Sequence, residues 1–152
     1  MDGQFRKKRL GVLSVLLLLL LFACGDSILN PRVKIDEPFQ LKYGQFKILQ
    51  PDNLVITFEQ LISDSRCPIG VVCFIAGDAE ILLRLQKGNS DPTTIHLKIG
   101  LRVTKKDTFA HQFVDALGYR FTLMELDPHP YMDKHFSKSS YTAFLKIQRN
   151  RE

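Results

Sequence analysis

The sequence lacks the residue patterns that usually carry catalysis. It contains no Gly-x-Ser-x-Gly nucleophile elbow, no phosphate-binding glycine loop and no Cys-x-x-Cys redox pair. Its carboxylates are scattered near the ends of the expected strands, so no two are predicted to face each other. His96 falls on the outward side of its segment, and His111 is isolated. We therefore expect no catalytic residues, no cofactor and no enzymatic activity.

The sequence also lacks a large excess of charge of one sign. The chain carries 21 Lys and Arg against 16 Asp and Glu, but four of the basic residues and one of the acidic residues precede Cys24. The rest of the chain has 17 basic and 15 acidic side chains, a net charge of +2. No basic run or interleaved aromatic stripe occurs there, so we expect no nucleic-acid partner.

Long hydrophobic runs are limited to one, from Leu10 to Phe22, directly after the basic residues Arg6 to Arg9. At ~1.5 Å per residue the run is too short to cross a hydrocarbon core of ~30 Å, and its length and flanks are typical of a signal peptide. It ends in Leu21-Phe22-Ala23-Cys24, which resembles the lipobox of bacterial lipoproteins, although Phe22 is bulkier than usual.

The lipobox resemblance implies cleavage before Cys24 and acylation of its thiol, with palmitate among the acyl chains. We then expect a membrane partner through this anchor, in the cell membrane or outer membrane, with the domain periplasmic or surface-exposed. Several acyl chains on one cysteine hold a protein firmly, whereas one holds it only marginally. The alternative is an ordinary secretory peptide in which Cys24 has no role.

Cysteine is scarce, with three residues in the chain. If Cys24 is acylated, Cys67 and Cys73 remain as a pair in an oxidising compartment, where pairing is the default. Two thiols alone do not complete a metal site. We predict a structural disulfide.

Alternation of apolar and polar residues dominates the remaining chain and predicts β-strands. Turn-forming residues separate the alternating segments, and no strong helical segment lies between them, which favours an antiparallel sheet structure. Residues 39–48 add a strand or a hairpin broken at Gly44, and residues 107–117 are ambiguous between strand and short helix. The alternating segments are 54–59, 79–86, 94–101, 119–124 and 141–148.

These patterns predict three parts. Residues 1–23 are expected to be the lipoprotein signal peptide, residues 24–37 a lipidated tether, and residues 38–150 the folded domain. The domain is predicted to be an all-β antiparallel β-sandwich, Ig-like or barrel-like, with one disulfide.

One motif is distinctive: Asp64-Ser65-Arg66-Cys67-Pro68, then Val71, Cys73 and Ala76-Gly77 before a strand. It resembles a family of small exported bacterial proteins with the motif Asp-Ser-Arg-Cys-Pro-x2-Val-x-Cys-x2-Ala-Gly, which has no established activity. Ile75 departs from the family, whose members often carry Trp there. The resemblance implies a fold but no reaction. Residues 118–119, 123, 128, 130, 141 and 143 also resemble the family's closing strands.

Two segments are candidates for binding. Arg66 is predicted to pair with Asp64 or cap loop amides, and the alternative is its presentation to a partner. His129, Asp133 and His135 are weak candidates for a metal, because their spacing matches no regular metal motif.

The favoured function is a lipid-anchored, non-catalytic binding module with an unknown envelope partner. The alternatives are a protease-inhibitor-like protein presenting the Cys67–Cys73 loop, and a metal-binding or enzymatic domain using the Asp127–His135 loop.

Overall fold

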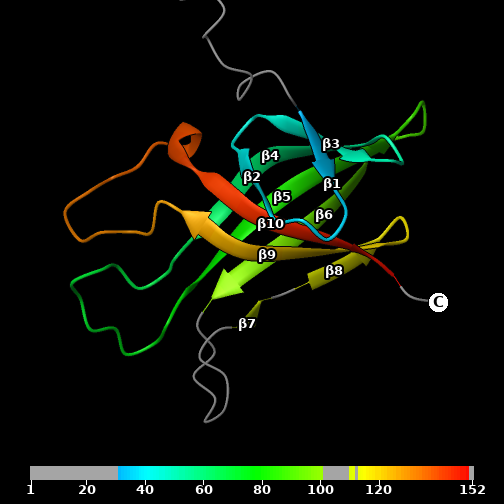
Figure 1. The fold of residues 1–152 in the computed structure, drawn as a ribbon. Helices are drawn as coiled ribbons and strands as arrows, with labels where there is room; N and C mark the ends of the chain where they lie inside the picture. Colours follow the sequence, from blue (N-terminus) through cyan, green and yellow to red (C-terminus); the bar gives the residue numbers. More distant parts are fainter. Residues whose placement is uncertain (1–30, 101–109, 112, 151–152) are drawn as a thin grey trace, which may run out of the picture. The chain divides into compact units, whose positions relative to one another are not determined.

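The structure is a computed structural model that describes residues 31–100, 110–111 and 113–150. The described residues form two β-sheets, with strand orders β1-β3-β4-β5-β6-β7 and β2-β10-β9-β8 (Figure 1). The predicted all-β sandwich is confirmed. The elements are β1 (Arg32–Lys34), β2 (Phe39–Lys42), β3 (Phe46–Gln50), β4 (Leu54–Asp64), β5 (Asp78–Lys87), β6 (Thr93–Gly100), β7 (Ala110–His111), β8 (Phe113–Ala116), β9 (Tyr119–Asp127), the 3₁₀ turn η1 (Lys138–Ser140) and β10 (Thr142–Arg149).

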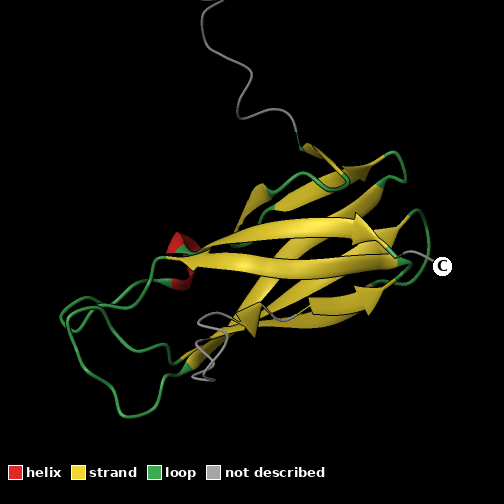
Figure 2. Ribbon diagram, turned by 60° about the horizontal axis from the view of Figure 1, so that its bottom comes forward, coloured by secondary structure: helices red, strands yellow, loops and turns green. Residues whose placement is uncertain are grey.

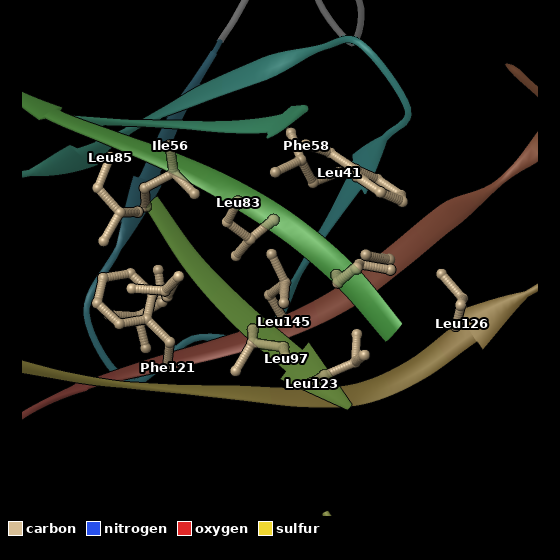
Figure 3. Packing of buried hydrophobic residues seen from close by; sticks show 14 of the residues in the cluster. Leu41, Ile56, Phe58, Leu83, Leu85, Leu97, Phe121, Leu123, Leu126 and Leu145 are labelled. Atoms are coloured by element: carbon tan, nitrogen blue, oxygen red, sulfur yellow. The ribbon is translucent and has the colours of Figure 1, made fainter. Parts of the chain in front are cut away.

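The hydrophobic core lies between the two sheets, and the alternating segments supply it. In β5, every second side chain from Ala79 to Leu85 is buried, and β10 follows the same rule. β9 follows it from Tyr119 to Leu123, after which a register shift in its pairing with β10 moves the next buried position to Leu126. Figure 3 shows Leu83 and Leu97 from the larger sheet beside Leu123 and Leu145 from the smaller one. Because side chains of a strand alternate between faces, the sequence pattern marks the buried face of these strands wherever the pairing is regular.

Residues 39–48 do not form a hairpin. β2 pairs with β10 in the smaller sheet, whereas β3 pairs with β4 in the larger one. Gly44, at a φ of +73°, allows the chain to turn from one sheet to the other, and its N–H donates to the carbonyl of Phe58. Leu41 and Leu49 are both fully buried, so the two strands contribute to one core from opposite sheets.

The domain begins earlier than the predicted boundary at residue 38. β1 pairs in parallel with β3, with Arg32 opposite Ile48, and Val33 and Ile35 pack against the core. The predicted tether therefore ends before Arg32. The pairing of β1 is parallel, unlike the antiparallel pairing predicted throughout.

In the ambiguous segment 107–117, residues 110–111 form β7 and residues 113–116 form β8, and Leu117 lies in the following turn at a φ of +52°, so none of its described residues is helical. Residues 107–109 and 112 lie outside the described residues, as do Cys24 and the whole predicted signal peptide. Among the residues that the structure describes, no helix is long and apolar enough to cross a bilayer.

Candidate functional site: a two-loop tip

Two long loops leave the same end of the sandwich and extend beyond the strands. One joins β4 to β5, and the other joins β9 to η1; they are the green and orange loops at the left of Figure 1, and Figure 2 shows them together from another side. The Ile69 N–H donates to the Pro130 carbonyl at 2.9 Å, and Ile69 and Tyr131 form a parallel bridge. We call residues 65–77 and 128–137 together the two-loop tip.

The first loop is closed by the Cys67–Cys73 disulfide, with a Cα–Cα distance of 5.9 Å. The predicted disulfide is confirmed. Gly70, at a φ of +89°, makes the turn inside the ring, where the Val71 N–H donates to the Pro68 carbonyl. Closing a ring of this size removes unfolded-state entropy worth about 2 kcal/mol.

Arg66 is buried at the base of the tip and joins the ends of two strands. Its Nε and Nη2 donate to the two carboxylate oxygens of Asp64 at 2.8 and 2.7 Å. Its Nη1 donates to the carbonyl of Leu126 at 2.6 Å, and Nη2 also donates to the carbonyl of Pro128 at 2.8 Å. The Tyr141 hydroxyl donates to Asp64 Oδ2 at 3.0 Å. We call these five residues the Arg66 network.

The Arg66 network has a structural function. It includes the pairing of Arg66 with Asp64 that the sequence predicted. The side chains of Arg66 and Asp64 are 9% and 6% exposed, and every nitrogen of the guanidinium and both oxygens of the carboxylate take part in hydrogen bonds. The guanidinium is thus engaged within the protein by four hydrogen bonds. The sequence could not indicate the two carbonyl acceptors, which lie 60 and 62 residues away.

Gly77 allows the base of the first loop to close. A Cβ atom at this position would lie 1.7 Å from the backbone oxygen of Ser65, so no other residue fits without moving the backbone. The close approach lets the Ser65 N–H and its hydroxyl both donate to the carbonyl of Asp78, at 2.7 and 2.9 Å. The Gly of the sequence motif therefore has a packing reason, which the sequence alone does not reveal.

The tip carries seven exposed apolar side chains on its two loops. Val72 and Phe74 are fully exposed, and no charged residue occurs from Cys67 to Gly77. Sequence reasoning missed this surface, although the uncharged run of eleven residues between two predicted strands was a visible signal. The exposed members are Ile69, Val71, Val72, Phe74, Ile75, Tyr131 and Met132.

A cavity of about 470 Å³ opens at the same end of the sandwich, between the first loop and the ends of β6 and β9. Arg66, Gly77, Ile99, Met124 and His129 are among its walls. Gly100, which also lines the cavity, precedes residues outside the described ranges.

The histidines of the second loop do not form a metal centre with their neighbours. His129 Nε2 lies 2.9 Å from the carbonyl oxygen of Cys67, to which it can donate, so this ring fastens the two loops together. Asp133 and His135 are exposed. Within residues 31–100, 110–111 and 113–150, no three His, Cys, Asp or Glu side chains gather as a possible metal site.

Replacing Arg66 by Met is expected to lower the free energy of unfolding by roughly 3–5 kcal/mol, because it leaves the buried Asp64 carboxylate without its cation. The matched control is Arg84→Met. Arg84 pairs with Glu59 at 4.0 Å, both side chains are more than 40% exposed, and its loss should cost less than about 1 kcal/mol. Urea denaturation measures both values. Equal losses in the two variants would contradict the structural function of the Arg66 network.

The free energy of unfolding is expected to fall at alkaline pH, in part because the Tyr141 hydroxyl ionises. Burial raises the pKa of its hydroxyl above the ordinary 10.0, and the neighbouring Asp64 carboxylate raises it further. The unfolded chain thus ionises first, so the contribution of Tyr141 is complete below pH 10 and is lost as the pH rises through the folded-state pKa. Tyr119 shifts in the same direction, so Tyr141→Phe should reduce the alkaline loss without abolishing it. Urea midpoints at pH 8 and pH 11 test this, and identical losses in wild type and variant would refute it.

Comparisons with known proteins provide no relative that would indicate a function. No protein-family model matches the chain, and no curated protein or solved structure matches it significantly. The family resemblance of residues 64–79 stays a prediction.

Proposed function

We propose that this chain is a lipid-anchored, non-catalytic binding protein of the bacterial cell envelope, and that the two-loop tip is its binding surface. The exposed apolar side chains gathered on the two joined loops of the tip carry this proposal. Single exposed hydrophobic residues are ordinary on protein surfaces, whereas a concentration of them marks a site of interaction. The side chains of Val72 and Phe74 are fully exposed and are not part of the hydrophobic core of the protein itself.

The tip is also held in one shape before it binds. The disulfide closes the first loop, the Arg66 network joins the strand ends below it, and the Ile69–Pro130 hydrogen bond joins the two loops. Preorganisation reduces the entropy lost on binding, so a small surface gains affinity. A rigid apolar tip is suited to recognition rather than to chemistry, for which the sequence supplies no nucleophile and base.

The anchor follows from the basic leader, the short apolar run and Leu21-Phe22-Ala23-Cys24. The eight residues from Cys24 to Pro31 span about 29 Å at most. An acylated Cys24 would keep the domain close to its membrane, cell or outer. The exported family that the Asp64–Ala79 motif resembles supports the same location.

Protease inhibition is the second candidate function, because the disulfide loop projects beyond the sheets (Figure 2). Arg66 is buried, so the residues entering a protease would be Val71, Val72 and Phe74. The target would then be a protease that accepts aliphatic or aromatic side chains. Stoichiometric inhibition of elastase-like or chymotrypsin-like enzymes would favour this candidate, whereas rapid cleavage of the loop would exclude it.

Lipidation predicts a specific mass for the protein in the membrane fraction. Intact mass spectrometry should show the precursor without residues 1–23 and with an acyl adduct on Cys24, and Cys24→Ala should release the protein from membranes. A mature N-terminus at another residue, or membrane retention unchanged by Cys24→Ala, would overturn the anchor.

Binding through the tip predicts a loss of affinity for isolated cell envelopes. Unacylated residues 25–152 should sediment with envelopes, and Val72→Ser/Phe74→Ser should reduce this binding at least about tenfold, since each large side chain is worth roughly 1.5–3 kcal/mol when buried. Phe46→Ser is the matched control, because Phe46 is a half-exposed ring on β3, outside the tip. Wild-type binding by the tip variant would contradict the proposed function.

A further inference from the structure

We propose that the occupant of the two-loop tip is a lipid bilayer, into whose headgroup–acyl boundary the apolar side chains insert. This inference rests on the proposed function, since it names the partner of the same surface. It makes the protein bind the envelope at two points, the acylated Cys24 and the tip.

The first observation concerns shape and hydrogen-bonding capacity. The two loops of the tip project beyond the ends of the sheets (Figures 1 and 2), and they carry Val72 and Phe74 fully exposed. From Cys67 to Gly77 the side chains are those of Cys, Pro, Ile, Gly, Val, Phe and Ala, none of them a strong hydrogen-bond donor or acceptor. Protein interfaces use about one hydrogen bond per 100–200 Å², whereas a bilayer interior requires none. The chemistry of this loop therefore fits lipid better than a protein partner.

The second observation is the position of positive charge. Lys134 and Lys138 are exposed in and just after the second loop, where Asp133 is the one acidic residue between 128 and 140. Lys134 Nζ lies 5.1 Å from the ring centroid of Tyr131, itself a member of the apolar set. Cations beside an apolar patch complement anionic lipid headgroups, and Tyr is a residue favoured at the membrane interface.

The third observation is the length of the predicted tether. An anchor at Cys24 with a reach of about 29 Å to Arg32 holds the domain beside the bilayer. The register places Arg32 level with Val55 of β4, about 30 Å from Asp64 at the base of the tip, so the anchor and the tip reach one bilayer together when the domain is tilted toward it. In that orientation, tethering turns tip insertion into an intramolecular step with a high effective concentration, so a weakly inserting surface suffices. The irregular backbone of the loops sets the depth, because unpaired peptide groups do not enter hydrocarbon. Side-chain insertion should stop at about 5–10 Å.

The absence of tryptophan from the sequence allows a direct test. Phe74→Trp places a single fluorophore on a fully exposed position of the tip, and Phe46→Trp places one on β3 as the control. The full lipidated chain of each variant is reconstituted into phosphatidylglycerol–phosphatidylcholine vesicles whose acyl chains carry bromine near the headgroup. We expect a blue-shifted emission and at least twofold quenching for Phe74→Trp, and a water-like, unquenched emission for Phe46→Trp.

A water-like, unquenched emission from Phe74→Trp overturns the inference. If envelope binding still depends on Val72 and Phe74 in that case, the proposed function stands and the tip binds a protein instead. If Cys24 is not acylated, the same variants are added to the vesicles from solution, and the same two emissions decide. If Phe74→Trp is quenched but Val72→Ser/Phe74→Ser does not change envelope binding, the tip inserts into lipid but the proposed function is refuted.

Discussion

The form of the tip depends on one buried guanidinium. Arg66 donates to the carboxylate that ends β4 and to two carbonyls at the end of β9, so a single side chain joins both sheets beneath the loops. A buried cation costs much desolvation energy, which is offset only by complete hydrogen bonding. Here every guanidinium nitrogen of Arg66 donates a hydrogen bond and both oxygens of Asp64 accept, with Tyr141 supplying a further donor to the carboxylate. Without this network, the joining of the two loops would rest on the contacts of Ile69 with Pro130 and of His129 with Cys67.

The other features of the tip act on this base. Gly77 lets the chain return within reach of Ser65, and the disulfide prevents the first loop from opening. His129 and Ile69 then fasten the second loop to the first through the carbonyls of Cys67 and Pro130. A flexible loop with this composition would fold its apolar side chains onto the nearest core. The rigid tip keeps them in solvent, where they are available to a partner.

Sequence patterns predicted the parts that depend on local periodicity. The segment 79–86 gave β5 with its buried face, because alternation is a property of the strand itself. They did not predict that the chain changes sheets at Gly44, since alternation does not say which strand is the neighbour. β1 is three residues long and too short to show a period. The sequence predicted the pairing of Arg66 with Asp64, which is two residues away. It did not predict the backbone carbonyls that accept from Arg66, because any residue type can supply a carbonyl.

The central claim is that Arg66 holds the two loops as one surface, and amide hydrogen exchange in Arg66→Lys tests it most directly. Lys keeps a positive charge beside Asp64 but cannot donate in several fixed directions at once. The Ile69 amide, which bonds to Pro130 across the loops, should exchange at least about tenfold faster, while the Leu83 amide in the centre of the larger sheet keeps nearly its wild-type protection. Unchanged protection of Ile69 would contradict the claim.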